Sequence, residues 1–381
     1  MVPKIRVVWH VYYNTRGAAG AYIDALQKAM WAEGLYSRAI VSCAYKFRTA
    51  GVLPFFFPFT DRVNYRGIGR RLLRGGELSL GYLILWSIAL FERPLINFSM
   101  NEDLAVDWLF LKLCRICGLV VFVTCHDLRT HDGGLSERRL EMIRTADAVI
   151  VHNQHACERV AAIVGHENVI VFPFPGSPYE GLLSAHNGDV AKRYWEPKLD
   201  RRPFICMIGF VRRSKGIETL LEAWNTLEDH EGFNLVIAGL WHDSGELKPV
   251  AGGLRDCIVE DRYVNDDELV YLIKAAKCVL LPYLDYTHSS VLISVLQNGG
   301  LVVTSDSGLF RELLGNYPLM FPAGSVKDLK DMLTKVMRLS DAEGRAIREY
   351  SARICEAEKR ELREGVAAAF GGQVEMRHRG R

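Results

Sequence analysis

The stretch FICMIGFVRRSKGIETLLEAW, residues 204–224, contains an apolar run, a basic turn and the start of a helical pattern. A continuous apolar run such as FICMIGF is typical of a strand buried on both faces of a parallel sheet. Beyond the turn, apolar residues recur at the i, i+3, i+4, i+7 spacing of an amphipathic helix that begins near Gly216. The turn between strand and helix carries three cations, Arg212, Arg213 and Lys215.

Cations beside a helix N-terminus are unfavourable, because the free N–H groups and the helix dipole there attract negative charge. A bound anion would offset that cost, and a basic loop that faces solvent is the alternative. Ligands of parallel α/β sheets bind beyond the carboxyl ends of the strands, which is where this turn lies. The turn is therefore a candidate anion site, with Arg212 and Lys215 as ligands and Arg213 facing solvent.

The strand–helix alternation runs through the whole chain and predicts the α/β class, with two Rossmann-like, doubly wound parallel-sheet domains. A length of 381 residues also fits two domains. The alternation is broken once, by a segment rich in Pro, Gly and polar residues. We expect an N-terminal domain at 1–175, a linker at 176–203, a C-terminal domain at 204–340, a C-terminal helix at 341–370 and a disordered tail at 371–381.

Composition narrows the class of protein. Hydrophobic residues make up 49% and charged residues 24% of the chain, and the net charge of +2 argues against a nucleic-acid partner. The longest apolar stretch, residues 78–91, is shorter than the roughly 20 residues of a membrane-spanning helix. The start of the chain alternates like a strand rather than a signal peptide, and the nine cysteines are scattered. We expect a cytoplasmic protein with reduced cysteines.

Three further loops carry residues suited to a ligand. In LPYLDYTHSSVLIS, residues 281–294, Ser289 and Ser290 begin a helix and leave N–H groups facing outward, although plain capping explains them too. In TRGAAGAYID, residues 15–24, Gly17 and Gly20 allow a close backbone approach. This loop is not a G-x-G-x-x-G fingerprint, which weakens a dinucleotide interpretation.

The third loop, FVTCHDLRTHDGG at residues 122–134, places His126 and Asp127 at the end of a buried strand. An imidazole at this position could bond sugar hydroxyls or transfer a proton. A purely structural histidine at a strand end is the alternative.

Taken together, these segments resemble the GT-B glycosyltransferases, near family 4 of the retaining, nucleotide-sugar-dependent enzymes. GFVRRSKGIETLLEA resembles the donor diphosphate motif G-x-x-R-x-x-K-G-x-x-x-L-L-x-A. Residues 281–312 resemble the second donor loop, VEDRYVNDDEL at 259–269 fits the element near the nucleotide base, and ADAVIVHN fits the end of the N-terminal domain. The resemblance covers nearly the whole chain and is best in residues 203–315.

The resemblance implies a GT-B fold whose two domains face a cleft, with no cofactor and no metal. The charge of the diphosphate is then neutralised by cations and helix N-termini. The implied catalytic residues are His126, Arg212 and Lys215. The implied donor-binding residues are Gly209, Arg212, Lys215, Gly216, Tyr263, Val264, Thr287, Ser289, Ser290 and Val291. The implied acceptor side consists of Gly17, Ala18, Gly20, His126 and Asp127.

The chain departs from the family pattern in its second donor loop. The two glutamates that many family-4 members carry fall on Tyr286 and Ser294, so no ribose ligand is carried over. Retention or inversion of stereochemistry is left open by this departure. The missing glutamates favour, as an alternative, a GT-B module that binds a nucleotide sugar without catalysis. An epimerase or phosphorylase of the same fold is a third hypothesis.

Residues 53–77 combine phenylalanines with a series of arginines, Arg62, Arg66, Arg70, Arg71 and Arg74. Basic residues beside aromatics suit an anionic membrane surface, whereas buried phenylalanines with solvated arginines are the alternative.

We therefore predict a metal-independent hexosyltransferase that uses a GDP- or UDP-linked sugar. Its acceptor would be a saccharide linked to a polyprenyl diphosphate, growing into an exopolysaccharide, capsule or lipopolysaccharide. The enzyme would lie peripherally on the inner face of the cytoplasmic membrane.

Overall fold

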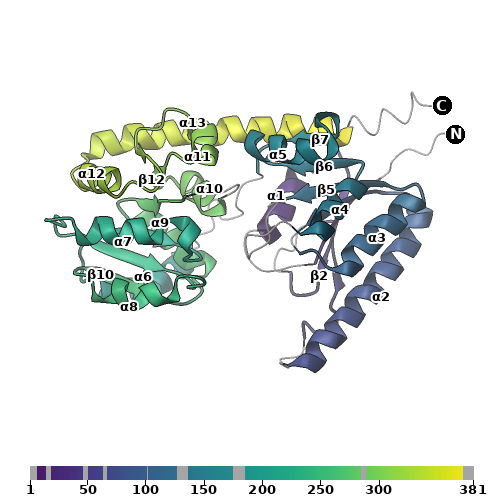
Figure 1. Cartoon of the computed structure of the whole chain (residues 1–381), viewed down its shortest axis with the longest axis horizontal. Helices are drawn as coiled ribbons and strands as arrows, with labels where there is room; N and C mark the ends of the chain where they lie inside the picture. The colour runs from purple at the N-terminus through teal and green to yellow at the C-terminus, as the bar shows by residue number, and fades with distance from the viewer. Residues whose placement is uncertain are drawn as a thin grey trace. The chain divides into compact units, whose positions relative to one another are not determined.

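The computed structural model describes residues 7–13, 19–45, 50–62, 67–100, 102–126, 136–174, 185–284 and 289–371. The chain divides into two compact units. The first consists of Met1–Pro175 with Glu358–Arg381, and the second of Gly176–Ala357. Each unit is built around one parallel sheet with helices beside it (Figure 1).

The first unit has a seven-stranded sheet in the order β3-β2-β1-β4-β5-β6-β7. Two buried clusters use alternate residues of its strands, so that both faces of the sheet are covered. The strands are β1 (Val8–Tyr12), β2 (Ser37–Ser42), β3 (Val52–Phe56), β4 (Leu95–Met100), β5 (Val120–Cys125), β6 (Ala148–Val151) and β7 (Val169–Val171). The helices are α1 (Ala19–Ala32), α2 (Ile68–Glu92), α3 (Ala105–Ile116), α4 (Glu137–Thr145) and α5 (Gln154–Val164).

The second unit has a six-stranded sheet in the order β10-β9-β8-β11-β12-β13. Its strands are β8 (Phe204–Ile208), β9 (Asn234–Ala238), β10 (Cys257–Glu260), β11 (Val279–Leu281), β12 (Val302–Ser305) and β13 (Met320–Phe321). Its helices are α6 (Ala185–Leu199), α7 (Ile217–Asn225), α8 (Lys248–Gly253), α9 (Asp266–Ala275), α10 (Ser290–Gln297), α11 (Gly308–Leu314), α12 (Val326–Met337) and the first part of α13 (Asp341–Val366).

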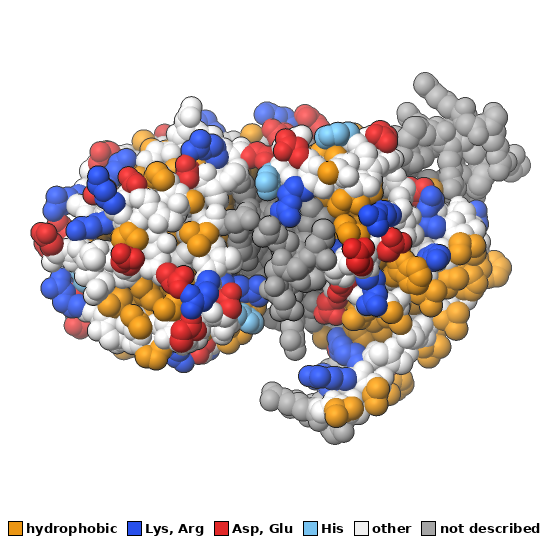
Figure 2. Space-filling model, in the orientation of Figure 1, with side chains coloured by type: hydrophobic (Ala, Val, Ile, Leu, Met, Phe, Trp, Pro, Cys, Tyr) orange, Lys and Arg blue, Asp and Glu red, His pale blue; other side chains and the backbone are white. Residues whose placement is uncertain are grey.

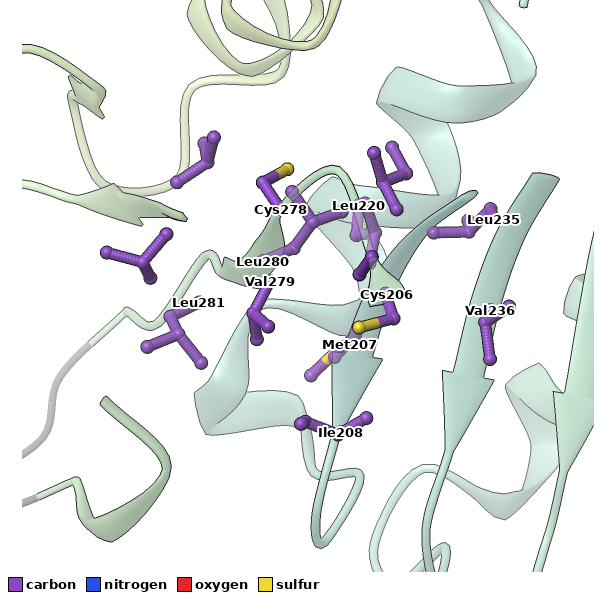
Figure 3. Packing of buried hydrophobic residues seen from close by; sticks show 14 of the residues in the cluster. Cys206, Met207, Ile208, Leu220, Leu235, Val236, Cys278, Val279, Leu280 and Leu281 are labelled. Carbon is purple, nitrogen blue, oxygen red and sulfur yellow. The ribbon is translucent and has the colours of Figure 1, made fainter. Parts of the chain in front are cut away.

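Figure 3 shows part of the core of the second unit, where side chains of β8, β9 and β11 pack with Leu220 of α7. The strand order reverses between β8 and β11, which makes this point the topological switch of the sheet. The first sheet reverses in the same way between β1 and β4. The predicted fold class, two doubly wound parallel-sheet domains, is confirmed.

The segment expected to be a linker, 176–203, contains α6. Trp195 and Leu199 of this helix are buried in the core of the second unit. Pro197 lies near the end of the helix, so the proline that suggested a linker is tolerated there. The stretch between β9 and β10 contains α8.

Residues 53–56 form most of β3, and residues 68–77 form the first part of α2. Pro54 is tolerated because β3 is the edge strand in the described part of the sheet. Helix α2 runs unbroken through Gly75 and Gly76 to Glu92. Burial of Leu78, Tyr82, Leu85 and Ala89 on one side of α2 stabilises it against the weak helix propensity of its glycines.

The glycines of α2 give a stability prediction. A β-carbon built on Gly76 has no described atom within 4 Å, whereas one on Gly81 would lie 3.1 Å from Phe56 Cδ1. We therefore expect Gly76→Ala to raise the free energy of unfolding by about 0.5–1 kcal/mol. Gly81→Ala, the matched control, gains the same propensity but crowds Phe56, so its stability should be lower than that of Gly76→Ala. Urea unfolding of both variants measures this, and equal midpoints would contradict it.

The end of α13 and the π-helical turn η4 (Ala367–Gly371) belong to the first unit. Val366 and Phe370 are buried in one of its two clusters. The ring of Phe370 lies 5.9 Å from that of Phe122 in β5, centroid to centroid. A β-carbon on Gly365 would lie 2.4 Å from Phe172 Cβ, so the helix contacts the chain after β7 closely. Of the predicted disordered tail, residues 372–381 lie outside the described residues.

Candidate active site

The loop after β8 is shaped by two glycines with positive φ angles, Gly209 (+99°) and Gly216 (+71°). A β-carbon on Gly216 would lie 1.9 Å from Pro282 O, so only glycine allows the loop to contact the chain after β11 this closely. The Leu284 N–H donates a 2.9 Å hydrogen bond to Ser214 O. The loops on the two sides of the switch point are therefore held together.

Lys215 lies in the 3-10 turn η2 (Arg213–Lys215), and its side chain is directed inward, with an exposed fraction of 6%. Its Nζ lies 5.1 Å from the centroid of the Tyr283 ring. A β-carbon on Gly209 would lie 3.8 Å from that Nζ and 3.3 Å from Val291 Cγ2, so the ammonium group lies close to the first turn of α10. Burial, and then the charge of Arg212, lower the pKa of Lys215 to about 8.

The other two cations of the turn differ from each other. The Arg212 guanidinium lies 5.7 Å from the centroid of the Phe210 ring. Its buried Nε has no hydrogen-bond partner among the described residues. Arg213, in contrast, forms ion pairs with Glu218 and Glu246. Its charge is balanced by the protein at the surface, which makes Arg213 less suited to a ligand than the buried Lys215.

The two serines that begin α10 have local partners. Ser289 caps the helix, since its Oγ accepts a 3.2 Å hydrogen bond from Leu292 N. The Ser290 carbonyl accepts a 2.8 Å bond from Ser294 Oγ. The capping role predicted as the alternative is therefore present. The N–H groups of the first turn of α10, from Ser290 onward, have no intrahelical acceptor by geometry, and Val291 of this turn lies near Lys215.

Tyr263 and Val264 follow β10, two strands away from β8 at the same edge of the sheet. Val264 is buried, whereas Tyr263 is 50% exposed. An ion pair between Arg262 Nη2 and Glu268 Oε1, at 2.6 Å, holds this loop against the start of α9. Tyr263 is thus presented to solvent from an anchored loop.

Exposed apolar side chains follow the neighbouring strands as well. They are Phe210 after β8, Leu240 after β9 and Leu284 after β11. Together with Tyr263 they give the carboxyl edge of four adjacent strands an apolar border. These residues were not predicted from the sequence, although a large apolar residue directly after a strand-end glycine, as in Gly209-Phe210 and Gly239-Leu240, was the available signal.

His126, predicted to be catalytic, directly follows β5 in the first unit. Its ring centroid lies 4.5 Å from that of Tyr22 in α1 and 5.4 Å from that of His152, which follows β6. Burial lowers the pKa of His152 to about 4, although the contact of its Nδ1 with Phe172 O raises it. Tyr22 and His152 were not predicted from the sequence. His152 follows its strand as His126 does, which was the available signal.

Several predicted residues cannot be placed. Four of them, Gly17, Ala18, Asp127 and Thr287, lie outside the described residues, and Gly20 is described only by its place in α1. The structure therefore brings together Gly209, Lys215, Gly216 and Val291, and places His126 in the first unit. Within the described ranges, no three His, Cys, Asp or Glu side chains are grouped so that they could hold a metal ion.

The buried ammonium group of Lys215 predicts a pH dependence of stability. Its pKa in the folded state, about 8, lies below its ordinary value of 10.5, so the folded protein loses this proton first as the pH rises. Relative to Lys215→Met, the free energy of unfolding of the wild-type protein should therefore be lowest below pH 8. It should rise by roughly 2 kcal/mol by pH 9.5. Urea unfolding of both proteins at pH 7 and 9.5 measures the difference. A difference that is constant with pH would contradict the prediction.

Part of the second unit is similar to known glycosyltransferases. Residues 192–354 match the model of the family described as glycosyl transferases group 1. An uncharacterized glycosyltransferase of Methanocaldococcus jannaschii is 28% identical over 135 residues, which are 32% of this chain and 34% of that protein. The chain thus spans about a third of the length of this curated relative.

Solved structures extend the likeness to the whole chain. The sucrose-phosphate synthase of Thermosynechococcus elongatus superposes with a TM-score of 0.67 at 15% identity, covering 99% of this chain and 100% of that chain. Anabaena HepE, in complex with UDP and glucose, gives a TM-score of 0.67 at 13% identity, covering 97% and 99%. The chain has the GT-B fold, and its residues 192–354 match the family model of the glycosyl transferases group 1.

Proposed function

We propose that the protein transfers a hexose from a nucleotide diphosphate sugar, linked to UDP or GDP, to a saccharide acceptor. The observation that carries this proposal is the buried ammonium group of Lys215, beside Arg212, at the switch point between β8 and β11. A desolvated cation with a second cation beside it is stabilised by an anion that carries more than one negative charge. The diphosphate of a nucleotide sugar is such an anion.

In this reaction, negative charge develops on the diphosphate as its bond to the sugar breaks. Arg212 can contact two phosphate oxygens through its planar guanidinium group, and Lys215 supplies a compact charge. The N-terminus of α10, which begins beside Lys215, adds the positive end of a helix dipole. These groups stabilise the leaving group without a metal ion. Gly209 and Gly216 allow the backbone to approach the phosphates, and Tyr263 and Val264 would lie near the nucleotide base.

The acceptor is proposed to bind the first unit near His126, with Gly17, Ala18, Gly20 and Asp127. His126 lies at the carboxyl end of β5, where ligands of parallel sheets bind. The acceptor would be a saccharide carried on a polyprenyl diphosphate, for an exopolysaccharide, capsule or lipopolysaccharide. The protein would then work peripherally at the inner face of the cytoplasmic membrane. The resemblance to family 4 in particular stays a prediction.

The test is a panel of UDP- and GDP-linked hexoses, with binding measured by titration calorimetry and nucleoside diphosphate release measured in the presence of EDTA. We expect one base to bind with submillimolar affinity and its sugar nucleotide to release the diphosphate when an acceptor is added. Binding without release under any acceptor would favour the non-catalytic module. Interconversion of two sugar nucleotides, or release only with inorganic phosphate, would identify an epimerase or a phosphorylase. Absence of binding to every nucleotide would overturn the proposal.

A variant of His126 separates the two proposed subsites. His126→Ala should lower turnover at least tenfold and leave nucleotide diphosphate affinity within about twofold, because proton transfer by a side chain contributes 10²–10⁴-fold in typical enzymes. Calorimetry with UDP or GDP measures the affinity. Parallel loss of nucleotide affinity would contradict the acceptor-side assignment. A large fall in melting temperature with unchanged turnover would show that the ring only packs against Tyr22 and His152.

A further inference from the structure

One side of α2 is apolar and faces solvent over the length of the helix. Eight large apolar side chains of α2 are more than a third exposed, with exposed fractions that reach 73% for Leu72 and 88% for Phe91. They are Ile68, Leu72, Leu73, Leu80, Leu83, Ile84, Ile88 and Phe91. Figure 2 shows hydrophobic side chains gathered along α2 and α3. We call these eight side chains the α2 strip. Among the described residues, no helix has the length and hydropathy to cross a bilayer.

The α2 strip offers almost no hydrogen-bonding groups to a partner. No charged residue occurs from 78 to 91. The two serines on the exposed side, Ser79 and Ser87, donate 2.9 Å hydrogen bonds to carbonyl oxygens one turn earlier in α2 itself. Protein–protein interfaces usually have a polar rim and about one hydrogen bond per 100–200 Å² of buried area. The strip lacks the side chains for such bonds.

The arginines of this region do not all face outward. The Arg74 guanidinium pairs with Asp61 at 2.6 Å and lies 3.5 Å from the centroid of the Phe57 ring. Arg70 Nη2 donates a 3.0 Å hydrogen bond to Thr60 O. Two arginines are therefore structural, and Arg66 lies outside the described residues. The buried Phe56 and Phe57 are core residues, as the alternative predicted.

Two exposed arginines, Arg62 and Arg71, remain near the N-terminal end of the strip. In the described parts of the chain neither forms an ion pair, whereas the acids of the region have partners. Asp61 pairs with Arg74, and Glu77 accepts a 2.8 Å hydrogen bond from Phe59 N. The exposed charge beside the strip is therefore positive. A second copy of the chain would bring no free acid of this region to these arginines.

We infer that the α2 strip binds the surface of a bilayer that contains anionic lipids. The apolar side chains would enter the boundary between headgroups and acyl chains, and Arg62 and Arg71 would contact the anionic headgroups. An interfacial helix usually has its polar side in water, and here the opposite side of α2 packs on the protein core instead. The inference rests on the proposed function for the lipid-linked acceptor, but its surface is defined by α2 alone.

Sedimentation with phosphatidylcholine vesicles, with and without 30% phosphatidylglycerol, tests the inference on the full chain. We expect wild-type protein to bind the anionic vesicles more tightly than the neutral ones, and less tightly in 0.5 M salt. Leu80→Glu and Leu83→Glu should each lower the partition constant about tenfold or more, and Arg71→Glu about fivefold or more. Val250→Glu, at an exposed apolar residue of the second unit, and Arg345→Glu are the matched controls and should bind like wild type.

The outcomes separate this inference from the proposed function. Vesicle binding that Leu80→Glu and Leu83→Glu abolish supports the inference even if no nucleotide binds. Nucleotide binding without any vesicle binding overturns the inference and leaves the proposed function standing. Vesicle binding that the two leucine variants leave unchanged also overturns it. If light scattering shows a dimer that Leu83→Glu dissociates, and no vesicle binding is found, a second copy covers the strip and the inference is wrong.

Discussion

Replacement of Lys215 by methionine is expected to lower nucleotide diphosphate affinity and turnover by roughly 10- to 150-fold. This range corresponds to the loss of one charge-assisted contact, about 1.5–3 kcal/mol. Methionine has a similar length and no charge, so it fits among Tyr283, Val291 and Gly209 without the cost of burying an ammonium group. The fold should be retained, because burial of the ammonium group opposes folding at neutral pH. Calorimetry with UDP and GDP and a release assay measure the two effects.

The matched control is Arg213→Ala, which removes a cation from the same turn. Arg213 is balanced by Glu218 and Glu246 at the surface, so its loss should change affinity less than about threefold. Similar losses in the two variants would show that the turn acts through its net charge rather than through Lys215. Unchanged affinity in Lys215→Met would place the donor phosphates elsewhere.

Gly216→Ala is expected to have the largest effect on stability, lowering the free energy of unfolding of the second unit by about 3 kcal/mol or more. Its φ angle of +71° disfavours any side chain, and the new β-carbon would lie 1.9 Å from Pro282 O. That oxygen belongs to the backbone, so the loops after β8 and β11 must separate. Nucleotide affinity should fall with stability, because Lys215 is held between these loops.

Gly232→Ala separates the two causes of this loss of stability, which are the positive φ angle and the contact of the new β-carbon with Pro282. Gly232 has a φ angle of +76°, and a β-carbon placed on it would have no described atom within 4 Å, so only the backbone conformation penalises alanine there. Its expected cost is about 1–2 kcal/mol, without a change in nucleotide affinity. Urea unfolding and calorimetry of both variants measure the comparison. Equal costs would show that the contact with Pro282 can relax without loss.

The fold was predictable where local pattern and burial agree. The apolar run before Gly209 and the helical spacing after Gly216 predicted β8 and α7 to within a few residues, because both elements bury a face of their own. Helix α6 was not predicted, because its polar residues and Pro197 are typical of a linker. Its one buried side, at Trp195 and Leu199, gave too weak a helical pattern. The start of α2 was also missed, because packing on the core overrides its glycines.

The candidate site was predictable where a single loop shows the chemistry. Three cations at a helix start indicated an anion site, and the structure adds that Lys215 is buried whereas Arg213 is paired with Glu218 at the surface. The apolar border of the sheet could not be predicted in the same way, because it depends on which strands are neighbours. Phe210 and Leu240 come together only through the pairing of β8 with β9.

The return of the chain to the first unit has a consequence for synthesis on the ribosome. The core around Phe122 contains Val366 and Phe370, which emerge after the whole second unit. After residue 175 the ribosome must add roughly 195 more residues, which takes about 10–40 s at 5–20 residues per second. During that time the first unit lacks part of its core, whereas the second unit has all of its residues before Val366 is added. We therefore expect the second unit to fold first and the nascent first unit to be the main target of chaperones.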